Sequence, residues 1–294
     1  MQPRKYGPFP YTPITRRPKL AWPGGARLAV WVIPNIEVFA LDAKMPGGQG
    51  SSGGLIPDVH TWAVRDYGNR VGVWRIMEVL ARHRMRATVA LNSDACDAHP
   101  ELIAEGVRLG WEFMGHNQTN VRRLNTIPAD RERDEIRGAV ERIARATGRP
   151  VAGWLGSGLQ ETWNTLDHLI EAGCKYVCDW VNDDQPYVMD VDGKRICSIP
   201  YSAEINDKSA VDHLHATPAE FEGMIRRTFD VLLRESRRSE SGRVMAVALH
   251  PYISGLPHRI DAIDSALKYI TSHEDVWLAT GEEIIDHYLK EAKA

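Results

Sequence analysis

Two histidines follow predicted strands that lie far apart in the chain. His116 comes after the strand-like stretch 111–114, and His250 comes directly after the apolar run 244–249. Histidine exchanges protons near neutral pH, so two of them in one pocket can act as general acid, general base or metal ligand. We therefore expect His116 and His250 to lie together over one pocket.

Two carboxylates also follow predicted strands and are candidate partners of these histidines. Glu37 comes after the apolar run 27–33, and Asp179 closes the stretch 176–179. Glu37 is the predicted general base, with an ordinary solvated strand-end glutamate as the alternative. Because a buried carboxylate needs a partner, Asp179 is predicted to orient the ring of His250.

Further polar and aromatic side chains follow the predicted strands and are expected to bind the substrate. They are Asn35, Asn117, Asn120, Trp154, Asp183, Asp184, Asn206 and Asp207. In a barrel of parallel strands, the C-terminal strand ends converge on one pocket, which is why these positions are candidates. An ordinary turn is the alternative interpretation of Asp183 and Asp184.

The order of strand-like and helix-like segments predicts the fold. Apolar runs typical of buried strands alternate with segments of helical periodicity about seven times between residues 27 and 294, without a break in composition. This pattern predicts an α/β fold, a distorted (β/α)7-type barrel in a single domain.

Two segments depart from the alternating pattern. Residues 1–26 are rich in proline and aromatic residues. They predict an extended N-terminal arm, packed either on its own barrel or on a neighbouring subunit. Residues 45–60 are rich in glycine. A long loop in a compact domain is often functional, and we expect it to be a lid over the substrate.

Composition limits the classes of partner. The chain has 294 residues and a formal net charge of -3. With neither sign in excess, nucleic acid and anionic membrane are not expected as partners, and a small molecule is. The four cysteines form no C-x-x-C pair and are predicted to be reduced thiols. No signal-peptide pattern begins the sequence, so we predict a cytoplasmic protein, and the aromatic arm favours a homo-oligomer.

Several short motifs together resemble a known family. They are Gly153-Trp154, the segment 182–187 (Asn-Asp-Asp-Gln-Pro-Tyr) and the segment 250–255 (His-Pro-Tyr-Ile-Ser-Gly). With the two histidine stretches, they are similar to the polysaccharide deacetylase superfamily (NodB homology), and most to its intracellular branch that contains a metal-independent allantoinase. The resemblance extends over nearly the whole chain and implies a distorted barrel.

The metal-binding motifs of that superfamily are altered in this sequence. The resemblance implies two adjacent acids in the first motif and two histidines spaced H-x-x-x-H in the second. Here Glu37 is followed by Val38, and Asn120 takes the place of the second histidine after His116. A zinc site needs about three protein ligands, and valine supplies none. We therefore predict no metal cofactor; the alternative is a zinc site rebuilt from Glu37, His116 and His250.

These observations predict a hydrolase of a non-peptide C–N bond in a small cyclic amide, ureide or imide. Glu37 would activate water, and His250 would protonate the leaving nitrogen. His116 and Asn120 would donate hydrogen bonds to the oxyanion. One alternative is a metal-dependent N-deacetylase of a saccharide. The other is a catalytically inactive barrel that binds a ligand.

Overall fold

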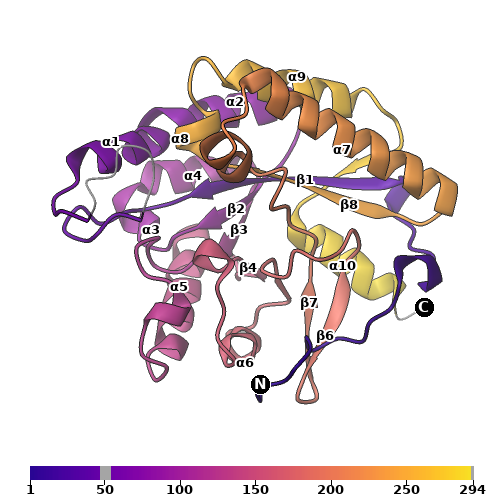
Figure 1. Ribbon diagram of the computed structural model, residues 1–294, viewed down its shortest axis with the longest axis horizontal. Coiled ribbons are helices and arrows are strands. Elements are labelled where there is room, and N and C mark those ends of the chain that lie inside the picture. Colours follow the sequence, from indigo (N-terminus) through magenta and orange to yellow (C-terminus); the bar gives the residue numbers. More distant parts are fainter. Residues whose placement is uncertain (47–53, 293–294) are drawn as a thin grey trace.

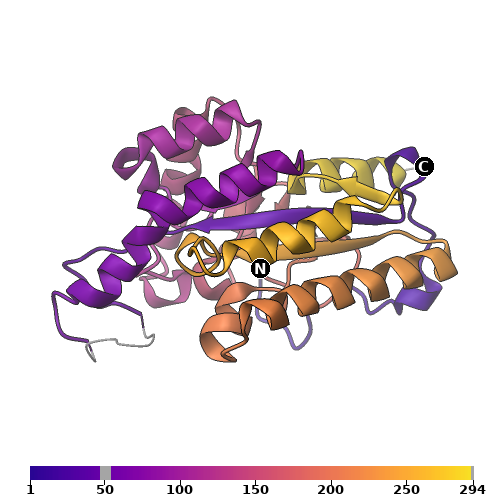
Figure 2. The ribbon, with the colours of Figure 1, turned by 90° about the horizontal axis from the view of Figure 1, so that it is seen from above.

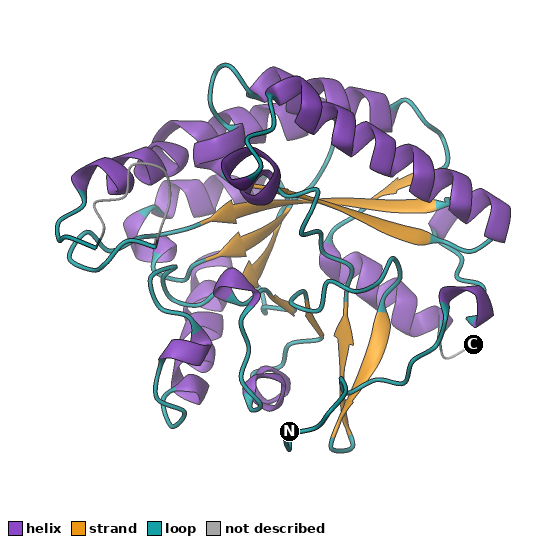
Figure 3. Cartoon of the chain, viewed as in Figure 1, coloured by secondary structure: helices purple, strands orange, loops and turns teal. Residues whose placement is uncertain are grey.

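A curled, mostly parallel β-sheet forms the centre of the computed structural model, which describes residues 1–46 and 54–292 (Figures 1 and 3). The strands are β1 (Leu28–Ile36), β2 (Thr88–Leu91), β3 (Glu112–Gly115), β4 (Gly153–Trp154), β5 (Tyr176–Val177), β6 (Tyr187–Val191), β7 (Lys194–Ser198), β8 (Arg243–Leu249) and β9 (Val276–Leu278). Their order is β6-β7-β5-β4-β3-β2-β1-β8, and β9 also pairs with β1. The α/β class and the distorted barrel predicted from sequence are confirmed.

Helices pack on both sides of this sheet, most of them on its outer face. They are α1 (Val59–Tyr67), α2 (Val73–Arg82), α3 (Ala95–Ala98), α4 (Pro100–Arg108), α5 (Glu132–Thr147), α6 (Thr165–Glu171), α7 (Pro218–Ser239), α8 (Pro251–Ser254), α9 (Ile260–Thr271) and α10 (Gly281–Glu291). Figure 2 shows α2, α9 and α7 side by side along β1 and β8. α7 begins with the predicted capping box, in which Thr217 accepts from the Glu220 N–H. In the described ranges, no helix combines the length and apolarity needed to cross a bilayer.

Alternate residues of β1 enter two separate hydrophobic layers, as the two-residue period of a strand requires. Val30 and Val32 pack in the layer between the sheet and the outer helices. Trp31 and Ile33 pack on the concave side, where α10 supplies Ile284 and other apolar residues. Every residue of β1 is buried. β1 is therefore paired on both sides and buried along its whole length, and its carboxyl end is enclosed by the fold.

The N-terminal arm packs on its own barrel. The Phe9 ring lies against Trp180 and Tyr187, with ring centroids 5.5 and 4.8 Å away. Farther along, the Trp22 indole N–H donates to the carbonyl of Arg243 over 2.9 Å. Of the two placements predicted for this arm, the described residues show packing on the chain's own body.

β6 and β7 form a hairpin, because they pair antiparallel. The segment predicted as a lid, 45–60, is described only in part, since 47–53 lie outside the described residues. Its last residues begin a helix that was not predicted: Asp58 caps α1 by accepting from the Thr61 N–H over 3.0 Å.

Candidate active site

Glu37 follows β1 and lies between the two histidines. Its Oε1 is 3.6 Å from His116 Nε2 and 3.7 Å from His250 Nε2. All three residues are buried. The fold therefore brings together the carboxylate and both histidines that the sequence singled out.

Parallel strands explain this meeting. His116 follows β3 and His250 follows β8, and the carboxyl ends of parallel strands lie at one edge of the sheet. Asn92, directly after β2, ties the neighbouring strand ends together. Its Oδ1 accepts from the N–H of Val38 over 2.9 Å, and its amide donates to the carbonyl of His116. Asn92 was not among the predicted site residues, although its place at a strand end was the available signal.

Asp207 fixes the orientation and charge of His250. Its Oδ1 is 2.7 Å from His250 Nδ1, and its Oδ2 accepts from the His250 backbone N–H over 2.7 Å. Ser254 donates to the same Oδ2 over 2.6 Å. Since a carboxylate accepts, Nδ1 carries the proton and Nε2 points towards Glu37. Burial works against a charged ring, but the charges of Asp207 and Glu37 outweigh it and raise the pKa of His250.

The predicted pairing of Asp179 with His250 is wrong. Asp179 instead accepts from the Gly156 N–H over 2.8 Å, in the loop after β4. Burial raises the pKa of Asp179 to about 7. Asp207 takes the role predicted for Asp179 because it lies in the loop that runs beside the end of β8, where Asn206 bridges to Ala248.

His116 is oriented from the opposite side of the pocket. Its Nδ1 lies 2.6 Å from the carbonyl oxygen of Leu155. Because a carbonyl only accepts, Nδ1 donates and Nε2 is directed at Glu37. The two imidazoles thus present the same ring nitrogen to one carboxylate.

The Glu37 carboxylate has one satisfied and one free oxygen. Oε1 accepts from the Asn120 amide over 2.7 Å. Both Oε2 and the Asn120 Oδ1 are buried and have no hydrogen-bond partner among the described residues. Burial opposes ionisation of Glu37, but the charge of His250 and the hydrogen bond of His116 prevail and lower its pKa. Since buried polar groups are normally paired, a water or substrate group is the expected partner of Oε2.

The residues around Glu37 do not match a zinc site. Val38 forms hydrogen bonds here through its backbone. Its carbonyl accepts from the Asn120 N–H, and its N–H donates to the Asn92 Oδ1. Asn120 presents an amide donor to Glu37. Within residues 1–46 and 54–292, no three His, Cys, Asp or Glu side chains are grouped so as to hold a metal ion. The expected absence of a metal cofactor and its alternative, a zinc site rebuilt from Glu37, His116 and His250, both stay predictions.

Asn35 lies two residues before Glu37, and Asn206 lies directly before Asp207. Asn35 is buried and donates to the carbonyls of Ile33 and Leu249. Asn206 donates to the hydroxyl of Tyr201 over 3.4 Å. Their amides are thus largely occupied by the protein itself.

Asn117 and Trp154 are both fully buried, and their predicted role in substrate binding stays a prediction. Asn117 is fully buried, has a left-handed backbone with φ 59°, and accepts from the Ser157 N–H. Trp154 is fully buried in the outer layer that faces the helices, and its indole N–H has no partner there. Both side chains support the loops after β3 and β4.

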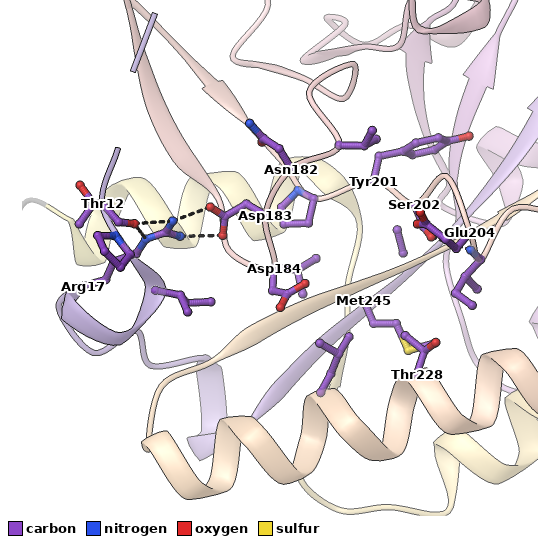
Figure 4. A pocket seen from close by; sticks show the side chains of 18 of the residues that line it. Thr12, Arg17, Asn182, Asp183, Asp184, Tyr201, Ser202, Glu204, Thr228 and Met245 are labelled. Atoms are coloured by element: carbon purple, nitrogen blue, oxygen red, sulfur yellow. Dashed lines mark hydrogen bonds and ion pairs between the residues drawn. The ribbon is translucent and has the colours of Figure 1, made fainter. Parts of the chain in front are cut away.

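Asp183 and Asp184 line a different cavity, with a volume of about 720 Å³. Figure 4 shows Arg17 of the arm pointing at Asp183, and the two guanidinium bonds are both 2.6 Å long. Asp183 also accepts from the Gln185 N–H, as an aspartate in a turn does. The alternative interpretation as turn residues therefore describes Asp183 better than a role beside Glu37.

Comparison with known proteins finds similarity to polysaccharide deacetylases. The polysaccharide deacetylase family model matches residues 60–177. A Schizosaccharomyces pombe protein named as a polysaccharide deacetylase is 26% identical over 291 residues, with 90% of each chain covered. This chain is thus similar to that family in residues 60–177 and to that relative over most of its length.

Solved structures agree with that similarity. PuuE allantoinase superposes with a TM-score of 0.84 and 25% identity, covering 94% of both chains. A protein of Pseudomonas aeruginosa PAO1, described as a polysaccharide deacetylase, gives a TM-score of 0.83 and 26% identity, covering 94% of this chain and 95% of that one. The predicted enzyme class, hydrolases of carbon–nitrogen bonds other than peptide bonds, is confirmed at that level.

Proposed function

We propose that this protein hydrolyses a C–N bond in a small cyclic amide, ureide or imide without a metal ion. The observation that supports this is the pairing of the Glu37 carboxylate with a histidine held by Asp207, where the donor set of a zinc site is lacking. A strained or activated ring carbonyl is easier to attack without a Lewis acid than the acetamide of a saccharide.

Two proton transfers follow from the geometry. Glu37 takes a proton from the attacking water through its free oxygen, Oε2. When the C–N bond breaks, His250 gives its Nε2 proton to the leaving nitrogen. Each pKa is shifted in the useful direction, because a lowered pKa favours the ionised carboxylate of Glu37 and a raised pKa favours the protonated imidazole of His250.

The oxyanion would form beside His116 and Asn120. Asn120 has a second amide hydrogen beyond the one donated to Glu37. His116 would donate from Nε2 when that nitrogen carries a proton, since Nδ1 is committed to Leu155. Removing one donor of an oxyanion hole costs about 2.7 to 4 kcal/mol of transition-state stabilisation.

A substrate panel with and without chelator tests the proposal. Hydantoin, succinimide, maleimide and allantoin should include a substrate whose turnover is unchanged by EDTA. Glu37→Gln should lower kcat/KM for that substrate by roughly 10²- to 10⁴-fold, because it removes the base. Glu101→Gln, an exposed glutamate on α4, is the matched control and should have no effect.

Two results would instead favour the alternatives. Deacetylation of an N-acetylated saccharide that depends on added zinc would indicate the metal-dependent deacetylase. Stabilisation by one of the cyclic amides without any turnover would indicate the inactive ligand-binding barrel. A cytoplasmic location and a homo-oligomer remain predictions, to be checked by fractionation and by light scattering.

A further inference from the structure

A single peptide group links Asp179 to His116. The carbonyl oxygen of Leu155 lies 2.6 Å from His116 Nδ1, and the N–H of Gly156 donates to Asp179 Oδ1 over 2.8 Å. This carbonyl and this N–H belong to one peptide group, because Leu155 and Gly156 are consecutive. The imidazole, the peptide and the carboxylate therefore form a continuous chain of hydrogen bonds that begins beside Glu37.

Contacts on both sides hold this peptide group in place. The hydroxyl of Ser157, the next residue, donates to the carbonyl of His116 over 3.2 Å. On the other side, a Cβ at Gly156 would lie only 2.9 Å from Asp179 Oδ2. Glycine therefore allows the carboxylate to approach the backbone closely. The loop after β4 thus fixes the peptide between the imidazole and the carboxylate.

A second carboxyl group lies beside Asp179. Asp179 Oδ2 is buried, and no amide, hydroxyl or basic group among the described residues donates to it. The carboxyl group of Glu161 lies within hydrogen-bonding reach of Asp179 and can donate only when it is protonated. Burial and the charge of Asp179 raise the pKa of Glu161 well above its usual range, so Glu161 holds the proton of the pair. Asp179 is then the carboxylate, and the charge of His116 favours its ionisation.

We infer that Asp179 is a positioning residue for His116 and acts through the Leu155–Gly156 peptide. Resonance joins the two ends of a peptide group, so an N–H that donates to a carboxylate makes the carbonyl oxygen a stronger acceptor. That oxygen binds the His116 Nδ1–H more tightly, stabilises positive charge on the ring and directs Nε2 into the pocket. The inference rests on the proposed function, in which this Nε2 donates to the oxyanion. Each histidine then has its own aspartate, since Asp207 binds His250 directly.

The NMR resonance of the His116 Nδ1–H in the substrate-free enzyme tests this link. Asp179→Asn keeps an oxygen that accepts from Gly156 but removes the charge. At pH 8.5 the resonance should therefore move upfield in this variant, because the hydrogen bond to Leu155 weakens. At pH 5.5 the wild-type Asp179 is protonated, since burial raises its pKa to about 7, and the difference between the two enzymes should shrink.

The groups around Asp179 determine this pH dependence. In the described part of the chain, Glu161 and His116 are the titratable side chains that act on Asp179. Cys178 stays a thiol because burial raises its pKa well above the usual range, and Glu132 acts on Glu161. Glu161→Gln keeps a neutral donor beside Asp179, so the pH response of the resonance should persist. Its loss in Glu161→Gln would assign the charge to Glu161 and overturn the inference.

Steady-state kinetics test the consequence for the reaction. Asp179→Asn should lower kcat about tenfold with little change in KM, which is less than the roughly 10²- to 10³-fold cost of losing a whole oxyanion donor. Asp190→Asn is the matched control. Asp190 also accepts from a glycine N–H, that of Gly193 over 2.8 Å, but in the exposed turn between β6 and β7. This control should change neither the resonance nor kcat.

A shift of equal size at pH 8.5 and pH 5.5, or no shift, would show that Asp179 only holds the loop and would overturn the inference. If Asp179→Asn does not fold, the wild type decides. Its Asp179 Cγ and His116 Nδ1–H signals should share a midpoint near pH 7, and separate midpoints overturn the inference. If no cyclic amide is turned over, the proposed function fails, while the NMR comparison still supports or overturns the link.

Discussion

Glu37 is the proposed base and His250 the proposed acid, and the role of His250 depends on a third residue, Asp207. Asp207 is fully buried and accepts three hydrogen bonds from His250 and Ser254. Its charge and that of Glu37 raise the pKa of the imidazole against the opposing effects of burial and of Lys208. The acid of the proposed reaction is therefore set by a carboxylate whose three hydrogen bonds all come from the protein itself.

Asp207→Asn should move the alkaline limb of the pH–rate profile to lower pH. A raised imidazole pKa keeps His250 protonated as the pH increases, and removing the Asp207 charge lets the proton leave earlier. We expect kcat/KM at the wild-type optimum to fall roughly 10²-fold. Profiles of kcat/KM from pH 5 to pH 9 measure both effects.

Ser254→Ala provides the comparison. It removes a hydrogen bond to Asp207 but no charge, so the limb should move less. An unchanged limb in Asp207→Asn, with activity simply reduced, would show that Asp207 only holds the loop.

The sequence predicted that Glu37, His116 and His250 lie together, but it did not predict which aspartate pairs with His250. Glu37, His116 and His250 could be found because each follows a strand. Asp179 and Asp207 also follow strand-like segments, and the choice between them depends on how the long loop before α7 returns to β8. The residues next to Asp179 or Asp207 in the sequence do not indicate the path of this loop.

Close packing between η3 (Gly68–Gly72) and α8 positions α8, the helix that begins directly after His250. A Cβ at Gly72 would lie 2.1 Å from the carbonyl oxygen of Pro251, and one at Gly255 would lie 2.5 Å from the Gly72 Cα. These glycines let two short helices touch through their backbones. The direction of His250, immediately before α8, follows from this contact.

Gly72→Ala should therefore reduce both stability and activity. The new methyl group has no room, and overpacking of this kind costs about 1 to 3 kcal/mol. Displacement of α8 should also lower kcat. Urea unfolding and steady-state kinetics on the same substrate measure the two effects.

Gly138→Ala is the matched control, because a Cβ there meets only the end of the Gln118 side chain at 3.6 Å. Within α5, alanine should raise the free energy of unfolding by up to about 1 kcal/mol. Equal behaviour of the two variants would contradict the role given to the contact between η3 and α8.

Sequence periodicity found the long elements and missed the short ones. α7 shows its apolar stripe and its capping box over many turns. α8 has four residues, which is too few for a helical period to be visible. The elements nearest the candidate site are therefore those that pattern reasoning predicts least well.

A buried carboxylate closes the opposite end of the half-barrel. Glu112, the first residue of β3, accepts from the Tyr176 hydroxyl over 2.6 Å and from Thr88 over 2.9 Å. It also accepts from the Glu282 N–H at the start of α10 over 2.9 Å. Burial raises the pKa of Glu112, although these three hydrogen bonds oppose the change.

The stability of the whole molecule should consequently respond to pH through Glu112. A carboxyl with a raised pKa binds its proton more tightly in the folded state, so its contribution is present at low pH and is lost as pH rises through the folded value. Glu112→Gln has no such proton. Between pH 4 and pH 8, the free energy of unfolding of the wild type should fall relative to that of Glu112→Gln. Parallel lines in urea titrations would contradict this.

The class of fold was predictable from the alternation of strands and helices, but the opening of the barrel was not. β1 pairs with β2 only at Asn35 and Ile36, because β9 pairs with its other half. This division depends on residues near the C-terminus, which no pattern around β1 reveals.

The pairing of β1 with strands far along the chain also determines when the candidate site can form during synthesis. β1 leaves the ribosome early, yet its full-length partner β8 and its second partner β9 are made last. Contacts between such distant segments form slowly, because a long intervening chain must first be arranged. Until Leu249 has been translated, Glu37 has no strand beside it that could deliver His250. The candidate site is thus assembled only after β8 and His250 have been made, and nascent chains that end before them carry the proposed base without its acid.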